Sequence, residues 1–208
     1  RICLNNPSLF KTQLRALLRA GVHGKPKIMF PMISSLDELR RAKKLLEEAA
    51  GELSEEGIPY REKIPVGIMV EIPAAAVLAD RFAKEVDFFS IGTNDLVQYT
   101  LAADRGNPSI ADVYTTFHPA VLKLIALTIS AAEKADIACG MCGEAAGNLT
   151  LVPLFLGFGL KEFSMSPSSI LKVRKLINSL NYEECKVLAE KVLQLDTANK
   201  IEKLLSNV

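Results

Sequence analysis

The hydrophobic positions of this chain alternate between short apolar runs and longer stretches with helical spacing. The short runs are bounded by glycine, proline or charged residues, which is typical of buried strands. They span residues 27–32, 66–70, 88–91, 137–141 and 162–165. Between them, apolar residues recur every three or four positions, which predicts helices. These are expected over about residues 6–19, 35–49, 74–84, 119–134 and 149–156, with another after Asp95 and three more at 168–179, 183–195 and 198–205.

This order of elements predicts an α/β protein with a parallel sheet, because strands that are apolar along their length are buried on both faces. A doubly wound sheet and part of a (β/α)₈ barrel both fit the pattern. The chain has neither a G-x-G-x-x-G fingerprint nor a Walker P-loop, which removes the commonest doubly wound proteins. A complete barrel usually takes about 250 residues. We therefore expect a (β/α)₈ TIM-type barrel that is N-terminally truncated to about five strands. The first residue is Arg1 rather than methionine, which favours a fragment or a processed product.

Composition and charge exclude several classes of protein. Hydrophobic residues make up 49% of the 208 positions and charged residues 24%, which is the usual mixture of a globular protein. A net charge of +1 gives no overall positive field to attract nucleic acid or anionic lipid. The longest apolar stretch, 149–160, is interrupted by Pro153 and is too short for a membrane span. No export signal opens the chain. We expect a cytoplasmic protein without membrane insertion or a nucleic-acid partner.

The four cysteines include one close pair, Cys139 and Cys142, separated by glycine and methionine. Such a pair could be a redox couple, half of a zinc site, or two inert buried thiols. A zinc site would need a second pair at matching spacing, and the sequence has none. A redox pair usually opens a helix, whereas this one follows a predicted strand.

Chemically active residue types follow the predicted strands at one end only. Glu71 comes directly after the second strand, Asp95 shortly after the third, and Cys142 ends the fourth. The opposite ends carry ordinary solvent-facing residues such as Lys27 and Lys63. In a barrel the carboxyl ends of the strands open on one face, where active sites are built. The pattern therefore predicts a site at that face.

Glu71 and Asp95 are the candidate metal ligands. They lie 24 residues apart, about one strand–helix unit, so they should stand on adjacent strand ends. Two neighbouring carboxylates repel each other unless a cation lies between them, and Mg²⁺ accepts such a pair while keeping water and phosphate oxygens. The alternative is that each carboxylate caps the helix that follows it. That alternative suits Asp95 better than Glu71, because Ile72 and Pro73 separate Glu71 from the next helix.

Other candidates could bind or protonate a ligand at the same face. Asn94 can donate an amide hydrogen bond, and Arg105 could grip an oxyanion with its planar guanidinium, although it could equally be an exposed loop arginine. Arg19 ends a predicted helix, where a cation is favourable in any case. The Cys142 thiol could donate or accept a proton. His118 precedes a proline and is expected to cap a helix or lie in a loop.

These segments resemble the C-terminal, phosphoenolpyruvate-binding domain of Enzyme I of the bacterial phosphoenolpyruvate:sugar phosphotransferase system. Pyruvate phosphate dikinase and phosphoenolpyruvate synthase are similar at the same strand ends, but the segments 98–101, 104–107 and 163–166 resemble Enzyme I specifically. The likeness runs from about residue 15 to residue 180. The matching segments are Val70-Glu71-Ile72-Pro73-Ala74, residues 87–96, Gln98-Tyr99-Thr100-Leu101, Asp104-Arg105-Gly106-Asn107, Gly140-Met141-Cys142-Gly143-Glu144 and Phe163-Ser164-Met165-Ser166.

The resemblance implies a phosphoenolpyruvate-binding barrel domain over residues 1–208, which is partial and ends in C-terminal helices at 181–208. It implies Mg²⁺ as cofactor, held by Glu71 and Asp95. It implies that phosphoenolpyruvate is contacted by Asn94, Asp95, Arg105 and Arg19. It also implies that Cys142 protonates C3 of the departing enolpyruvate to give pyruvate.

For the parent family the resemblance implies transfer of the phosphoryl group to a histidine on a separate N-terminal domain and then to HPr, the first step of sugar uptake, in a homodimer. Here only His23 and His118 occur, and neither lies in a setting like that acceptor. The resemblance also implies further strands before Arg1, which these 208 residues are not expected to supply. We therefore expect weak or no phosphotransfer by these 208 residues alone, and association through the unpaired sheet edge. The alternatives are a dikinase or synthase barrel and a non-catalytic phosphoenolpyruvate-binding regulatory fragment.

Overall fold

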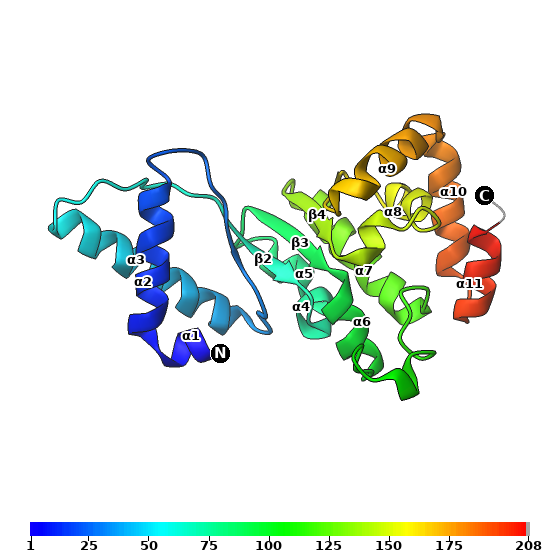
Figure 1. The fold of residues 1–208 in the computed structure, drawn as a ribbon, viewed down its shortest axis with the longest axis horizontal. Helices are drawn as coiled ribbons and strands as arrows, with labels where there is room; N and C mark the ends of the chain where they lie inside the picture. Colours follow the sequence, from blue (N-terminus) through cyan, green and yellow to red (C-terminus); the bar gives the residue numbers. More distant parts are fainter. Residues whose placement is uncertain (207–208) are drawn as a thin grey trace.

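A computed structural model of the chain describes residues 1–206 and has an α/β fold with one parallel sheet (Figure 1). The sheet lies in the middle of an elongated molecule, with α2 and α3 at one end and α9 to α11 at the other. Neighbouring strands are parallel throughout. The strands are β1 (Ile28–Phe30), β2 (Val66–Val70), β3 (Phe88–Gly92), β4 (Ala138–Cys142) and β5 (Glu162–Phe163).

The helices follow the expected order along the chain. The one long helix expected over residues 74–84 is instead two short ones that break at Leu78, and a short first helix was not expected. No helix among residues 1–206 is long and apolar enough to cross a membrane. The helices are α1 (Ile2–Asn5), α2 (Pro7–Ala20), α3 (Leu36–Glu55), α4 (Pro73–Val77), α5 (Ala79–Phe82), α6 (Thr93–Leu101), α7 (Pro119–Lys134), α8 (Val152–Gly157), α9 (Pro167–Ser179), α10 (Tyr182–Leu193) and α11 (Ala198–Leu205), with 3-10 turns η1 (Pro108–Ile110) and η2 (Glu144–Gly147).

The strand order separates the two architectures that the sequence left open. The order in the sheet is β1-β2-β3-β4-β5, so each strand pairs with its neighbours in the sequence. A doubly wound sheet reverses its order at a switch point, whereas a barrel adds strands consecutively. Within residues 1–206 the sheet is open, since β1 and β5 each pair on one side only. The prediction of five parallel strands is confirmed, and their order is that of a barrel segment.

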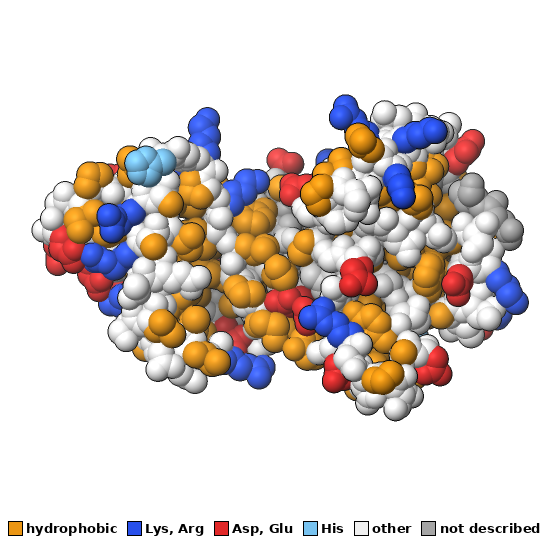
Figure 2. Space-filling view, in the orientation of Figure 1, with side chains coloured by type: hydrophobic (Ala, Val, Ile, Leu, Met, Phe, Trp, Pro, Cys, Tyr) orange, Lys and Arg blue, Asp and Glu red, His pale blue; other side chains and the backbone are white. Residues whose placement is uncertain are grey.

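The two faces of the sheet differ in burial. Ile68, Phe89 and Met141 are at most 1% exposed and pack in the hydrophobic core against the helices. Met69 and Ser90 point to the opposite face and remain partly exposed. Figure 2 shows hydrophobic side chains gathered over the strands in the middle of the molecule. The expectation that the strands are buried on both faces is therefore wrong for one face, which in a closed barrel would be the interior.

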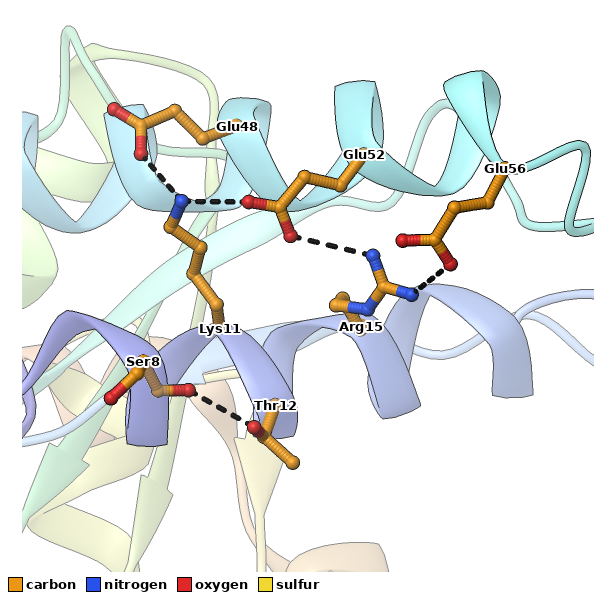
Figure 3. Close-up of polar contacts among 7 residues, drawn as sticks. All are labelled: Ser8, Lys11, Thr12, Arg15, Glu48, Glu52 and Glu56. Carbon is orange, nitrogen blue, oxygen red and sulfur yellow. Dashed lines mark hydrogen bonds and ion pairs between the residues drawn. The ribbon is translucent and has the colours of Figure 1, made fainter.

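A ladder of ion pairs fixes α2 against α3 (Figure 3). The Lys11 ammonium lies 3.0 Å from a Glu48 oxygen and 2.7 Å from a Glu52 oxygen. The Arg15 guanidinium continues the ladder, at 3.3 Å from Glu52 and 2.6 Å from Glu56. Glu52 accepts from both cations, so the pairs form one network that sets the register between the two helices.

The starts of α3 and α2 differ in whether a side chain caps the helix. The start of α3 is confirmed, because Ser35 Oγ accepts the Glu38 N–H at 3.2 Å and Glu38 Oε2 accepts the Ser34 N–H at 2.7 Å. Glu38 thus binds the residue before the N-cap, whereas the third helical residue of a standard capping box binds the N-cap N–H itself. Asn6 occupies the N-cap position of α2, but its side chain does not cap the helix, since its amide donates backwards to the Ile2 carbonyl.

Replacing Gly157 with alanine is expected to destabilise the protein by about 3 kcal/mol, the upper end of the usual cost of overpacking. Gly157 ends α8 where this helix crosses α10, and an added methyl group would fall on the backbone carbonyl of Cys185. Gly51 is the matched control, because it lies inside α3 with nothing within 4 Å of an added methyl group. Gly51→Ala should stabilise the protein by up to about 1 kcal/mol. Urea unfolding of both variants measures the difference, and equal effects would contradict the prediction.

Candidate active site

The register of the sheet brings three predicted positions into one row at the carboxyl ends of the strands. Gly92 pairs with Cys142, and Val70, the residue before Glu71, pairs with Ile91, the residue before Gly92. Glu71, Gly92 and Cys142 therefore stand side by side on neighbouring strands. Strands lie about 4.8 Å apart, so the row spans about 10 Å. All three positions point to the face of the sheet that carries Met69 and Ser90, because side chains alternate along a strand.

Glu71 is a buried carboxylate, and one of its two oxygens already accepts a hydrogen bond from the backbone. Its side chain is 3% exposed, and Oε1 accepts the Met32 backbone N–H at 2.7 Å. A Cβ atom built on Gly92 would lie 3.1 Å from Oε2, so this oxygen lies over the next strand. Met32 reaches Glu71 from the end of β1 with φ of 56°, a conformation that bulky residues rarely adopt. Such backbone strain is concentrated at functional sites.

Burial raises the pKa of Glu71 above its ordinary value. The hydrogen bond from Met32 lowers this pKa, and the negative charge of Asp95 raises it further. The charge of Asp95, on the neighbouring strand end, thus acts on Glu71.

Asp95 lies in the first turn of α6, which begins directly after β3. Among residues 1–206 its carboxylate makes no hydrogen bond and no ion pair, and α6 has no side-chain cap. Glu71 does not cap α4 either, because the cap position is Ile72. The capping alternative is therefore wrong for both carboxylates.

Two adjacent carboxylates with free oxygens fit a hard divalent cation such as Mg²⁺, which binds one or two carboxylates and completes its shell with water and substrate oxygens. The residues that the structure describes contain no cluster of three or more His, Cys, Asp or Glu side chains suited to a metal. Glu71 and Asp95 would thus supply two ligands and leave the remaining positions open.

The side chain of Asn94 is held in one orientation by the backbone of η2, which follows β4. Its Oδ1 accepts the Glu144 backbone N–H at 3.3 Å, so its NH₂ group is left to donate elsewhere. Gly143 makes this contact possible, since its φ is +108° and an added Cβ would lie 2.5 Å from Thr93 Oγ1. A side chain at position 143 would separate the two strand ends.

The Cys142 thiol lies on the same face as Glu71. Its sulfur is 3.4 Å from Ser90 Oγ and 3.6 Å from the Ile91 carbonyl oxygen. Cys139 points to the other face and packs against the hydrophobic core, and burial raises its pKa to about 12. The redox interpretation of this pair is therefore wrong, because residues three apart in a strand face opposite sides. Cys139 is instead consistent with an inert buried thiol, which was one of the alternatives that the sequence left open.

Arg105 lies on the exposed segment 102–118, between α6 and α7. Its backbone N–H donates to Gln98 Oε1 at 3.3 Å, and its guanidinium makes no hydrogen bond or ion pair with any described residue. The charges of Arg105, Glu144 and Asp95 all act on the Tyr114 hydroxyl. Arg105 and Asp95 thus act on the same hydroxyl, which donates to the Asn94 carbonyl oxygen.

Arg19 is not brought to this cluster. It lies exposed in the last turn of α2, and the next turn packs at Gly21 against Arg61 and Ile64, which precede β2. That is the amino edge of the sheet, whereas Glu71 lies at the carboxyl edge. We therefore leave Arg19 out of the site proposed below.

Two residues of the cluster were missed as candidates. Glu144 appeared only as the end of a motif, and its backbone N–H rather than its charge orients Asn94. Tyr114 gave no signal, because it stands in a polar segment without periodicity, and its contact with Asn94 joins positions 20 residues apart. His118 behaves as expected and caps α7, with Nδ1 accepting the Ala120 N–H at 3.2 Å. An open cavity of about 710 Å³ adjoins Asn94 and Glu144 on the side of β5.

Replacing Glu71 with glutamine is expected to stabilise the metal-free protein at neutral pH. Because the folded state raises the pKa of Glu71, it binds the proton more tightly than the unfolded chain does. The unfolding free energy of the wild type should therefore fall as pH rises from the ordinary glutamate pKa through the raised one. Glutamine carries no such charge, so the stability gap between variant and wild type should widen over that window. Thermal unfolding in EDTA measures the gap, and a gap independent of pH would contradict the prediction.

Comparison with known proteins identifies the family. The family described as "PEP-utilising enzyme, PEP-binding domain" matches residues 1–182. The phosphoenolpyruvate-protein phosphotransferase of Listeria monocytogenes is 54% identical over 205 residues, which cover 99% of this chain and 36% of that protein. The protein of that name from Staphylococcus carnosus is 53% identical with the same coverage. This chain therefore spans about a third of the length of the curated relatives it matches.

A solved structure with the same fold is more distant in sequence. A citrate lyase from Burkholderia xenovorans LB400 superposes with a TM-score of 0.58 at 17% identity, covering 94% of this chain and 66% of that one. This likeness concerns the fold alone. The resemblance recognised in the sequence is confirmed by the family match and by the relatives. The chain belongs to the family of PEP-utilising enzymes, in which it matches the PEP-binding domain.

Proposed function

We propose that this chain is the phosphoenolpyruvate-binding part of a phosphoenolpyruvate-protein phosphotransferase, and that it binds phosphoenolpyruvate together with Mg²⁺. The observation that carries the proposal is the row of Glu71, Gly92 and Cys142 at the carboxyl ends of the strands, together with the effect of the Asp95 charge on Glu71. The names of relatives at 53–54% identity favour this reaction over that of a dikinase or synthase.

Glu71 and Asp95 would hold the cation through their free oxygens. When bound, Mg²⁺ neutralises negative charge on substrate oxygens and so favours phosphoryl transfer. The hydrogen bond from Met32 keeps Glu71 Oε1 in place and leaves Oε2 for the ion. The negative charge of two adjacent carboxylates is then balanced rather than repulsive.

Asn94 and Arg105 would bind the anionic substrate. The Asn94 NH₂ group can donate to a phosphoryl or carboxylate oxygen, because its carbonyl oxygen is already engaged by Glu144. The Arg105 guanidinium can make paired hydrogen bonds to two phosphoryl oxygens. Charge-assisted donors of this kind stabilise the charge that develops during transfer.

Cys142 would complete the reaction as the acid. When the bond between phosphorus and the enol oxygen breaks, the phosphoryl group passes to a histidine nitrogen of the acceptor and the electron pair stays on the enolate. C3 of the enolate then takes the proton from Cys142 Sγ, which gives pyruvate, and solvent returns a proton to the thiolate. A positioned general acid typically contributes about 10²–10⁴-fold to such a step.

The acceptor in this proposal is a histidine on a separate N-terminal domain, which passes the phosphoryl group on to HPr in the cytoplasm. A homodimer of the parent protein belongs to the same proposal. None of the described residues offers that acceptor: His118 caps α7, and His23 is exposed near the amino edge of the sheet.

Two measurements test the proposed function. Calorimetric titration of the chain with phosphoenolpyruvate should show binding that depends on Mg²⁺. Phosphorylation of HPr from phosphoenolpyruvate should be weak or absent with this chain alone and should rise when the N-terminal domain is added. Absence of Mg²⁺-dependent binding would contradict the proposal. Binding without transfer, even after the domain is added, would favour a regulatory role instead.

A further inference from the structure

The segment 102–118 connects the proposed substrate-binding arginine to the rest of the site. It leaves α6 at Ala102, whose φ of 50° turns the chain out of the helix, and it rejoins regular structure at α7. Arg105 lies near its beginning and Tyr114 near its end, and most residues between them are exposed. A segment of this kind does not by itself hold an arginine in a fixed place, because its exposed backbone has few contacts.

Tyr114 ties this segment to the strand end that carries the predicted ligands. Its hydroxyl donates to the Asn94 carbonyl oxygen at 2.9 Å, and its ring packs partly buried against the hydrophobic core. The accepting carbonyl belongs to the peptide that joins Asn94 to Asp95. Holding this peptide plane fixes the backbone from which both side chains project.

Charged groups of three separate segments act on the Tyr114 hydroxyl. Arg105 acts on it from the same segment, Asp95 from α6 and Glu144 from η2. Burial raises the pKa of Tyr114, so the phenol remains a neutral donor at physiological pH. The hydroxyl is thus a stable donor to the Asn94 carbonyl oxygen, within the influence of both positive and negative groups.

We propose that Tyr114 is a positioning residue: its hydrogen bond to the Asn94 carbonyl holds the Arg105 segment so that the guanidinium and the Asn94–Asp95 pair face the same anionic ligand. This inference rests on the proposed function, because the ligand in question is phosphoenolpyruvate. Tyr114 acts through Arg105 and through the Asn94–Asp95 peptide, and it makes no contact with the reacting atoms in this account.

The variant that tests the proposal is Tyr114→Phe, which removes the hydroxyl and keeps the ring. Tyr99→Phe is the matched control, since Tyr99 is 44% exposed and its hydroxyl makes no hydrogen bond with the described residues. In calorimetry with Mg²⁺, Tyr114→Phe should bind phosphoenolpyruvate about three- to tenfold more weakly, the usual effect of losing one hydrogen bond. Tyr99→Phe should bind like the wild type.

A double-mutant cycle with Arg105→Ala separates positioning from general loss of structure. Because Tyr114 acts partly through Arg105, the Tyr114→Phe change should weaken binding less in the Arg105→Ala background than in the wild type, and the loss that remains reports the Asn94–Asp95 peptide. An equal loss in both backgrounds would overturn the proposal, as would wild-type affinity in the single variant.

A second readout needs no substrate. Trypsin cleavage at the Arg105–Gly106 bond, followed by mass spectrometry, should be several-fold faster in Tyr114→Phe than in the wild type or Tyr99→Phe, because the segment opens more often. Equal cleavage rates would overturn the proposal. If the wild type binds no phosphoenolpyruvate, the proposed function fails, and the cleavage rates still decide whether Tyr114 holds the segment.

Discussion

Replacing Cys142 with alanine should slow the exchange of pyruvate methyl protons for deuterium by at least about 100-fold, the lower end of what a positioned general acid or base contributes. By microscopic reversibility, the group that protonates C3 of the enolate also removes a proton from pyruvate. This exchange needs no phosphoryl acceptor, so it can be followed by proton NMR with the chain, Mg²⁺ and pyruvate in D₂O. The thiol faces the open side of the sheet, beside Ser90 and in the row with Glu71.

Cys139→Ala is the control for this experiment. Cys139 belongs to the same strand but packs against the core on the opposite face, so its loss should leave the exchange rate nearly unchanged. Wild-type exchange in the Cys142→Ala chain, or an equal loss in both variants, would show that Cys142 is not the proton donor.

Removing both carboxylates, Glu71→Ala with Asp95→Ala, should lower the Mg²⁺-dependent affinity for phosphoenolpyruvate by at least about 100-fold. Each carboxylate would supply an oxygen to the ion, and charged contacts of this kind contribute about 1.5–3 kcal/mol each, which is more than tenfold in affinity. Calorimetric titration with and without Mg²⁺ measures the effect. Affinity in the absence of the ion should change little or rise, because two negative charges no longer repel the anion.

The matched control removes two exposed carboxylates elsewhere, Glu47→Ala with Glu62→Ala. Glu47 lies on α3, and Glu62 lies before β2 at the amino edge of the sheet. The control should retain Mg²⁺-dependent binding. If the Glu71 and Asp95 double variant binds as tightly as this control, the metal assignment is wrong.

The main features of the site could be predicted from the sequence because they follow strand ends. Glu71, Asp95 and Cys142 each lie at or just after the end of an apolar run, and parallel strands bring such ends to one edge. The parallel five-stranded sheet was predictable for the same reason, since apolar runs alternate with helical periodicity. The order of the strands in the sheet could not be predicted from the sequence, because it is known only once the structure shows which strands pair.

The features that could not be predicted depend on contacts that leave no local pattern. Arg19 was a candidate only through the family resemblance, and the direction of α2 places it at the opposite edge of the sheet. The contact between Tyr114 and Asn94 joins an irregular segment to a strand end, and no periodicity marks either partner. The partial exposure of one face of the sheet was also not predicted. An apolar strand has the same sequence pattern whether its second face is covered or open.

The place of Cys142 within the backbone hydrogen bonds of the sheet has a stereochemical consequence. An enolate is planar, and a donor anchored in a strand rather than in a mobile loop can approach only one side of that plane. Under the proposed function, phosphoenolpyruvate that carries deuterium and tritium in one defined geometry at C3 would therefore receive its third hydrogen from one side and yield a methyl group of a single handedness. The handedness of the methyl group would then depend on the side of the sheet to which β4 directs the Cys142 side chain.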